Sequence, residues 1–193
     1  MKIDPKFVIK VAGTLTVIAL VTAALLGLVD GVTRDKIAEI EAEKTRVAMS
    51  AVAPAGSEFT DKLDIPDAAA EAAAAQGGKV VELYGVKAGG CVMKVTASGS
   101  QGTITMMVGV DANNAITGIS VVSHAETSGI GTKVCGNELN DAGVPVLDQF
   151  IGMSGAGSLV VKKNIVPITT ATVSTKGITT GANAALAAAE ALG

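Results

Sequence analysis

The stretch TITMMVGVDANNAITGISVV, residues 103–122, predicts a β-hairpin. Two runs rich in Val, Ile, Met and Thr, 103–110 and 115–122, flank a polar turn that contains Asp111 and two asparagines, Asn113 and Asn114. Short runs of this composition are typical of strands, and Asp and Asn favour the backbone conformations that hairpin turns need. These features predict two adjacent antiparallel strands.

Further elements follow on either side of the hairpin. Two runs of the same kind precede it at 80–86 and 91–97, and breaks rich in glycine and serine separate them. An alanine-rich segment, 68–75, comes before the strands, and another, 182–192, ends the chain; alanine has the highest helix propensity. The predicted fold class is α+β, an antiparallel sheet flanked by helices.

The segment between the hairpin and the terminal helix is less regular. It predicts a loop over 124–133, a helix over 147–151 and a strand over 159–162. An earlier start of the helix, near Glu138 and interrupted by Pro145, is the alternative. A cluster of threonines and serines then leads into the terminal helix.

The N-terminal region predicts a membrane span. Residues 11–29 carry no charge, and as a helix they extend about 28 Å, close to the thickness of a bilayer's hydrocarbon core. Lys2, Lys6 and Lys10 precede the run, and the positive-inside rule then puts the N-terminus in the cytoplasm. A cleaved signal peptide would have a shorter apolar run and a small-x-small cleavage site, so an anchor is favoured.

These features divide the chain into four parts. They are a cytoplasmic N-terminus (1–10), a transmembrane helix (11–29), an extracytoplasmic helical stalk (30–56) and an outer domain (57–193). The stalk is predicted from the partial apolar stripe that continues the helix until Pro54 and Gly56. The predicted location is the cell membrane, with a single pass and the main domain on the outer side.

Composition excludes several classes of function. The net charge of −3 and the near-absence of aromatic residues argue against nucleic acid as a partner. One histidine and two separated cysteines, Cys91 and Cys135, do not make a metal site, and two free, buried thiols are favoured over a disulfide. No nucleophile elbow and no phosphate-binding glycine loop is present. We therefore predict no catalytic residue and no metal.

Two segments stand out: SHAETSGIGTK, residues 123–133, and PITTATVST, residues 167–175. The second has five hydroxyl side chains within seven residues, just before a helix. One interpretation is a helix cap made by Ser174 or Thr175. The other is a phosphate seat, since free N–H groups and hydroxyls at a helix N-terminus favour an anion and the small Ala171 allows close approach. The residues alone favour neither.

Taken together, the two segments resemble the FMN-binding domain shared by RnfG of the Rnf complex and NqrC of the sodium-translocating NADH:quinone reductase. In that family FMN is attached by a phosphoester to the last residue of the pattern D-x-x-[ST]-G-A-[ST]. Thr169, Ala171 and Thr172 match the hydroxyl, alanine and acceptor positions. The stretch MMVGVDANNAITGISVVSHAETSGIG, 106–131, is similar to a second family segment, and the likeness covers nearly the whole chain. The resemblance implies covalent FMN on Thr172.

The chain departs from the family pattern at two positions. Thr170 stands where the family has glycine, and Val166 stands where it has aspartate. If the backbone at 170 needs a positive φ, a β-branched residue there is strained. Thr170 is also an alternative acceptor.

The resemblance also places the loop 124–133 near the flavin ring. It implies that His124, Glu126, Thr127 and Thr132 are cofactor-binding residues, with the threonine hydroxyls as hydrogen-bond partners of the ring. The alternative is an ordinary surface loop with a solvated Glu126. A structural role is favoured for His124, since no acid–base step is implied.

By this resemblance the chain is a flavin-bearing electron-transfer subunit of an Rnf-type ion-translocating ferredoxin:NAD⁺ oxidoreductase. Its implied partners are the other Rnf subunits and the membrane, and it is not expected to be active alone. Two alternatives remain: the corresponding NqrC-like component of the sodium-translocating quinone reductase, and a membrane-tethered, non-redox binding domain in which the threonines only cap a helix.

Overall fold

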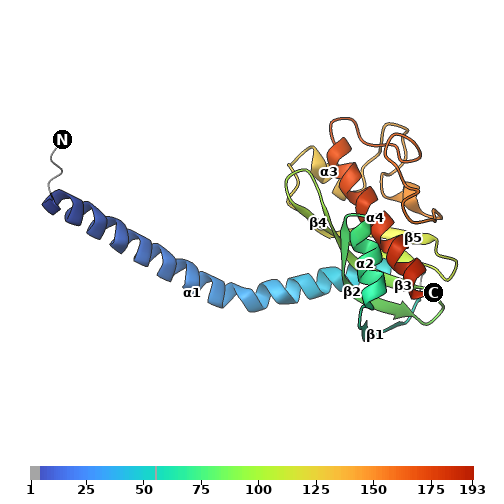
Figure 1. Ribbon diagram of the computed structural model, residues 1–193, viewed down its shortest axis with the longest axis horizontal. Coiled ribbons are helices and arrows are strands. Elements are labelled where there is room, and N and C mark those ends of the chain that lie inside the picture. Colours follow the sequence, from blue (N-terminus) through green and yellow to red (C-terminus); the bar gives the residue numbers. More distant parts are fainter. Residues whose placement is uncertain (1–4, 55) are drawn as a thin grey trace. The chain divides into compact units, whose positions relative to one another are not determined.

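The computed structural model describes residues 5–54 and 56–193. The chain forms two compact units, 1–43 and 44–193. In chain order (Figure 1) the elements are α1 (Pro5–Val52), β1 (Phe59–Leu63), α2 (Asp67–Ala75), β2 (Gly78–Val86), β3 (Cys91–Ser98), β4 (Thr103–Val110), β5 (Ile116–Ser123), α3 (Gly131–Cys135), a 3₁₀ turn (Asp148–Phe150) and α4 (Thr172–Leu192).

Helix α1 is long and apolar enough to cross a membrane. Its most apolar window has a mean hydropathy of 2.2, and none of that window is buried within the chain. This helix fits a single-pass membrane protein.

The second unit is built on a five-stranded sheet in the order β1-β2-β3-β4-β5, with every neighbouring pair antiparallel. Each strand pairs with the next along the chain; short turns connect β2 to β5, while α2 lies in the connection between β1 and β2. The α+β fold with an N-terminal apolar helix is confirmed, and the four predicted strands lie within two residues of the expected bounds.

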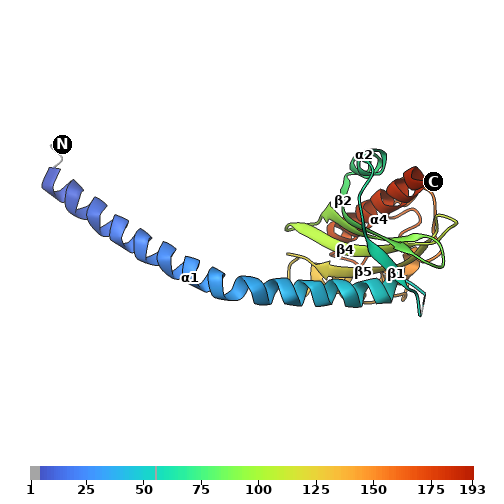
Figure 2. The ribbon, with the colours of Figure 1, turned by 90° about the horizontal axis from the view of Figure 1, so that it is seen from below.

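Helices α2 and α4 cover one face of the sheet (Figure 2). Alternate residues of β3 and β4, such as Met93 and Met106, point to this face and are fully buried with Ile178 and Leu186 of α4. A Cβ atom on Gly177 would lie 2.8 Å from the backbone carbonyl oxygen of Ser98, so a glycine at this position lets the first turns of α4 lie close to the end of β3. This packing fixes the position at which α4 begins.

The last turns of α1 cover the opposite face. Ala48 and Val52 are buried there against Val92 and Met107, which alternate with the residues that face α4. The Thr117 hydroxyl donates a hydrogen bond of 2.5 Å to the carbonyl oxygen of Val52. The compact unit therefore begins at Lys44, earlier than the predicted boundary at residue 57.

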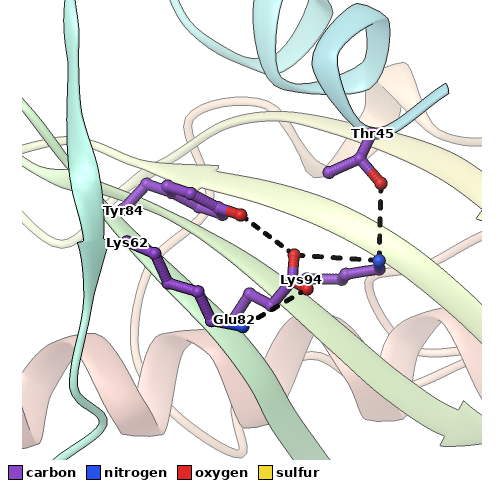
Figure 3. A network of polar contacts seen from close by, with 5 residues as sticks. All are labelled: Thr45, Lys62, Glu82, Tyr84 and Lys94. Carbon is purple, nitrogen blue, oxygen red and sulfur yellow. Dashed lines mark hydrogen bonds and ion pairs between the residues drawn. The ribbon is translucent and has the colours of Figure 1, made fainter. Parts of the chain in front are cut away.

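A polar network lies beside this second apolar cluster (Figure 3). Lys94 Nζ lies 3.4 Å from the Thr45 hydroxyl and 3.7 Å from Glu82 Oε2. Glu82 also accepts a hydrogen bond of 3.1 Å from the Tyr84 hydroxyl and pairs with Lys62 at 3.4 Å. Burial, followed by the hydrogen bond to Glu82 and its charge, raises the pKa of Tyr84. The network links the end of α1 to β1, β2 and β3.

Three sequence predictions in the irregular region were wrong. The expected helix over 147–151 is only the 3₁₀ turn Asp148–Phe150, and the antiparallel bridge between Leu139 and Pro145 excludes the earlier start at Glu138. The expected strand over 159–162 is a turn with a single bridge between Val161 and Ile165. The expected loop over 124–133 ends in the short helix α3.

Cys91 and Cys135 are free, as expected, and both are half-buried. Burial raises the pKa of each thiol to about 11, so neither is a reactive thiolate at neutral pH. Among the described residues no group of three or more His, Cys, Asp and Glu side chains is arranged to hold a metal ion.

Candidate functional site

The threonine cluster begins with a tight turn over residues 168–171. The Ala171 N–H donates a 2.9 Å hydrogen bond to the carbonyl oxygen of Ile168, and Thr170, the third residue of the turn, has a φ of 77°. A positive φ at this position is typical of type II turns, where glycine is preferred. A β-branched residue there costs about 1–3 kcal/mol in backbone strain. The glycine position of the family pattern is thus a left-handed position in this chain.

Asp141 holds the second residue of this turn. Its two carboxylate oxygens accept hydrogen bonds from the Thr169 N–H at 2.9 Å and from the Thr169 hydroxyl at 2.7 Å. The hydroxyl bond and then the backbone bond keep the pKa of Asp141 below its ordinary value. The carboxylate is therefore ionised at neutral pH.

Thr172 is the first residue of α4 and is half-buried. It lines an open pocket of about 530 Å³ between the start of α4 and the turn that contains residues 159–162. Lys162 and Lys176 line the same pocket, and both lysines are exposed. Because a helix N-terminus carries a partial positive charge, Thr172 shares this pocket with two lysines and the positive end of α4. The full lining comprises Leu159, Val160, Val161, Lys162, Thr172, Lys176, Thr179, Thr180 and Asn183.

The wall opposite α4 is held by two asparagines, which is why it is not a strand. The buried Asn183 accepts hydrogen bonds from the N–H groups of Gly157 and Leu159 and donates one to the Leu159 carbonyl. Asn164 accepts from the Val160 N–H at 2.7 Å. Backbone groups that a strand would use for pairing are engaged by side chains instead, and Lys162 has a φ of 68° at the tip of the turn.

The helix-cap interpretation of Ser174 and Thr175 was wrong. Helix α4 begins before both residues, with Ala171 at its N-cap and no side-chain cap. The Ser174 hydroxyl donates a short hydrogen bond to Glu126, and the Thr175 hydroxyl donates to the Ala171 carbonyl at 3.0 Å. The first N–H groups of α4 are therefore left without a capping oxygen from either residue.

The loop 124–133 packs against α4 through a buried carboxylate. Glu126 is only 7% exposed, so the solvated Glu126 of the alternative interpretation was wrong. Its Oε1 accepts hydrogen bonds from the N–H groups of Ser100 at 2.7 Å and Gln101 at 3.2 Å, while Oε2 accepts from Ser174. Glu126 thereby joins three segments: the β3–β4 turn, its own loop and the first turn of α4.

The other predicted residues of this loop make local contacts. His124 Nδ1 accepts a 3.3 Å hydrogen bond from the Glu126 N–H, and the Thr132 hydroxyl accepts one of 2.9 Å from Gly129. The Thr127 side chain is exposed. The lining of the lysine pocket comes entirely from 159–162 and α4, so these loop residues lie outside it. Their contact with a flavin ring stays a prediction.

We predict that Glu126→Gln destabilises the domain at neutral pH by about 1–3 kcal/mol, because two backbone N–H groups and Ser174 lose a charged acceptor. Desolvation raises the pKa of Glu126, but the bonds from Ser174, Gln101 and Ser100 and the nearby His124 together lower it below its ordinary value of 4.5. Because the folded pKa is the lower one, the stabilisation is present above pH 4.5 and is lost as the pH falls through the folded pKa. Urea unfolding at a series of pH values from neutral to acid should therefore show the two proteins converging in acid.

Glu138→Gln is the matched control, since Glu138 is an exposed carboxylate and its loss should change stability by no more than about 0.5 kcal/mol. A constant difference between Glu126→Gln and the parent at every pH would show that the Glu126 charge does not contribute.

Sequence reasoning missed Asp141, Lys162 and Lys176. Lys176 follows Thr172 by four residues, the spacing that puts two side chains on one helix face, so it was within reach of pattern analysis. Asp141 and Lys162 come from separate irregular segments, and nothing local signals their approach.

Comparison with known proteins gives two family matches. The FMN-binding domain family matches residues 99–187, and the RnfG N-terminal region family matches residues 1–52. The first range contains both segments that stand out in the sequence, and the second contains helix α1.

Among curated proteins, the chain is 31% identical to the G component of the Na⁺-translocating ferredoxin:NAD⁺ oxidoreductase complex of Acetobacterium woodii, over 95% of this chain and 92% of that protein. It is 30% identical to the G component of an ion-translocating oxidoreductase complex of Methanosarcina acetivorans, over 79% and 82% of the two chains. A third relative, from Cereibacter sphaeroides and of the same name, is 31% identical over 69% and 70%. With both family matches covering its two units, the chain belongs to the RnfG family of ion-translocating oxidoreductase complexes.

Proposed function

We propose that this protein is the flavin-bearing electron-transfer subunit of an Rnf-type ion-translocating ferredoxin:NAD⁺ oxidoreductase, with FMN bound covalently through its phosphate to Thr172. The observation that carries the proposal is the position of Thr172: the first residue of α4, on a pocket that two lysines also line, inside the FMN-binding domain match. The lysines and the helix N-terminus supply the positive charge that a phosphodiester needs.

The pocket also suits the rest of the cofactor. Its volume of about 530 Å³ lies within the usual range for small-molecule sites, and it is open to solvent. Flavin supplies the one- and two-electron chemistry, and the protein supplies position and charge. An exposed flavin that is held by a covalent bond can exchange electrons with neighbouring subunits without being lost to dissociation.

Covalent attachment requires an activated donor, because an ester does not form from a free phosphate and an alcohol in water without a driving force. We infer that the donor is a flavin dinucleotide. The Thr172 oxygen attacks the flavin-side phosphorus, the phosphoanhydride bond breaks, and a nucleoside monophosphate leaves. The hydroxyl proton passes to a base of the transferring enzyme. No electrons are gained or lost in this step.

We propose that the N-terminus is cytoplasmic and the sheet domain lies on the outer side, because Lys2, Lys6 and Lys10 precede the apolar run. In a chain whose two cysteines are replaced by alanine, a membrane-impermeant thiol reagent applied to intact cells should label a cysteine introduced at Lys87 and not one at Lys6. Permeabilised cells, in which both sites should react, are the control. Labelling at residue 6 of intact cells would reverse the orientation.

Of the two alternatives, the quinone reductase component is disfavoured by relatives that carry the name of the G component and by the match to the RnfG N-terminal region. The non-redox binding domain differs in one simple observable. When the chain is produced with a flavin transferase and run on a denaturing gel, covalent FMN gives a fluorescent band at the size of the chain. A dark band under these conditions would favour the binding domain.

A further inference from the structure

We propose that Asp141 supplies the carboxylate that the flavin-attachment pattern has three residues before Thr169, and that it is a positioning residue for the acceptor turn. The pattern has aspartate where this chain has Val166. The inference rests on the proposed function, because the step it affects is the attachment of FMN to Thr172.

The contacts of Asp141 are those expected of the absent aspartate. A carboxylate three residues before Thr169 has the reach to accept hydrogen bonds from the N–H and hydroxyl groups of that residue, as Asp side chains do in local turns. In this chain both bonds go to Asp141, at 2.9 Å and 2.7 Å, from a residue that lies far away in the sequence. The Asp141 N–H also donates to the Pro167 carbonyl at 3.3 Å, so its loop is joined to the acceptor segment by backbone as well.

Hydrogen bonds made by Asn140 order the loop that carries Asp141. Asn140 is 7% exposed, and its Oδ1 accepts hydrogen bonds from the N–H groups of Ala142 at 2.9 Å and Val144 at 3.1 Å. The Asn140 N–H donates to the Val144 carbonyl at 2.8 Å, which closes the loop. Because this loop is already ordered, Asp141 loses little conformational entropy when it binds Thr169.

The turn needs this restraint because of its strained residue. Thr170 has a φ of 77°, and a chain with threonine there relaxes readily to other conformations when it is not held. Asp141 holds Thr169 on one side of Thr170, and the bond from Ala171 to Ile168 holds the other. Restraint at both neighbours keeps the turn in the form that leads directly into Thr172 and α4.

Residue 166 is a suitable position at which to introduce an aspartate. Val166 is exposed, and its backbone N–H and C=O are already bonded to the side chain of Gln149, so a new side chain there disturbs no buried contact. This gives a rescue experiment that a purely structural role for Asp141 would not pass.

The test measures the initial rate of covalent flavin incorporation into the purified full-length chain, with a flavin transferase and flavin adenine dinucleotide, by fluorescence of the denatured protein. Asp141→Ala should slow incorporation roughly tenfold or more, since two hydrogen bonds to a charged acceptor are lost. The double variant Asp141→Ala, Val166→Asp should regain an initial rate of flavin incorporation within about threefold of the parent rate. Val166→Asp alone should label at least as fast as the parent, and Glu138→Ala, an exposed carboxylate nearby, should label like it.

Three results would overturn the inference: a parental rate in Asp141→Ala, no recovery in the double variant, or slower labelling of Val166→Asp alone. Each leaves the proposed function intact, because the parent chain still takes up flavin. A parent chain that never becomes fluorescent contradicts the proposed function itself, so the two failures are distinguishable.

Discussion

Thr172→Ala should abolish covalent flavin completely while leaving the domain folded. The phosphoester needs the Thr172 oxygen, which lies on the pocket that Lys162 and Lys176 also line. Loss of one half-buried hydroxyl at the start of a helix should cost about 1 kcal/mol or less in unfolding free energy. The measurements are in-gel flavin fluorescence, urea unfolding, and ferredoxin-dependent NAD⁺ reduction by membranes that contain the whole complex, which should fall to background.

Thr172→Ser is the matched variant, since it keeps the nucleophilic oxygen, and it should retain flavin. Thr170→Ala tests the alternative acceptor, because Thr170 is exposed and also has a hydroxyl. Fluorescence that survives in Thr172→Ala and disappears in Thr170→Ala would move the attachment site to the turn residue. That result would contradict the assignment of Thr172 but not the covalent flavin.

Removing the last turns of α1 should lower the unfolding free energy of the domain strongly. A chain that begins at Lys44 keeps the whole second unit and should unfold cooperatively. A chain that begins at Ser57 exposes Val92 and Met107, both fully buried in the intact chain, and loses Val52 as well. Three side chains of this kind contribute roughly 5 kcal/mol, a large part of the stability of an ordinary domain.

Two substitutions test the same contact without truncation. Val52→Ala should lower the unfolding free energy by about 2 kcal/mol, because Val52 is 1% exposed and packs against the sheet. Val47→Ala, on the same helix at a residue that is 56% exposed, should change it by less than about 0.5 kcal/mol. Equal stability of the chains that begin at Lys44 and at Ser57 would show that α1 is only a tether.

The sequence predicted those parts of the fold that depend on local pattern. Strands β2 to β5 alternate or run as apolar segments between turn residues, so composition was enough to find them. Strand β1 was missed because it is an edge strand with mostly exposed residues, FTDKL, which carries no apolar alternation. Residues 159–162 have the composition of a strand, but Asn183 and Asn164 bind their backbone from elsewhere in the chain.

Some features of the candidate site could be predicted from a contiguous pattern, and others could not. The family pattern puts glycine at position 170, and the structure gives Thr170 the positive φ that this position suggested. The assignment of Thr172 as the acceptor comes from the same pattern and stays a proposal. The alternative interpretation, a helix cap made by Ser174 or Thr175, was wrong because helix α4 starts at Thr172 and has no side-chain cap. The partners of the site, Asp141 and Lys162, depend on how distant loops pack, and a single sequence holds no local signal for that.

Esterification of one FMN to Thr172 would change the mass of the chain, so the decisive measurement is the intact mass of the full-length protein. Purified after production with a flavin transferase, the chain should be heavier than its sequence by one FMN less one water, and fragmentation should place that mass on the peptide containing Thr172. A chain of unmodified mass, or an added mass on any other residue, would contradict covalent attachment of FMN at Thr172.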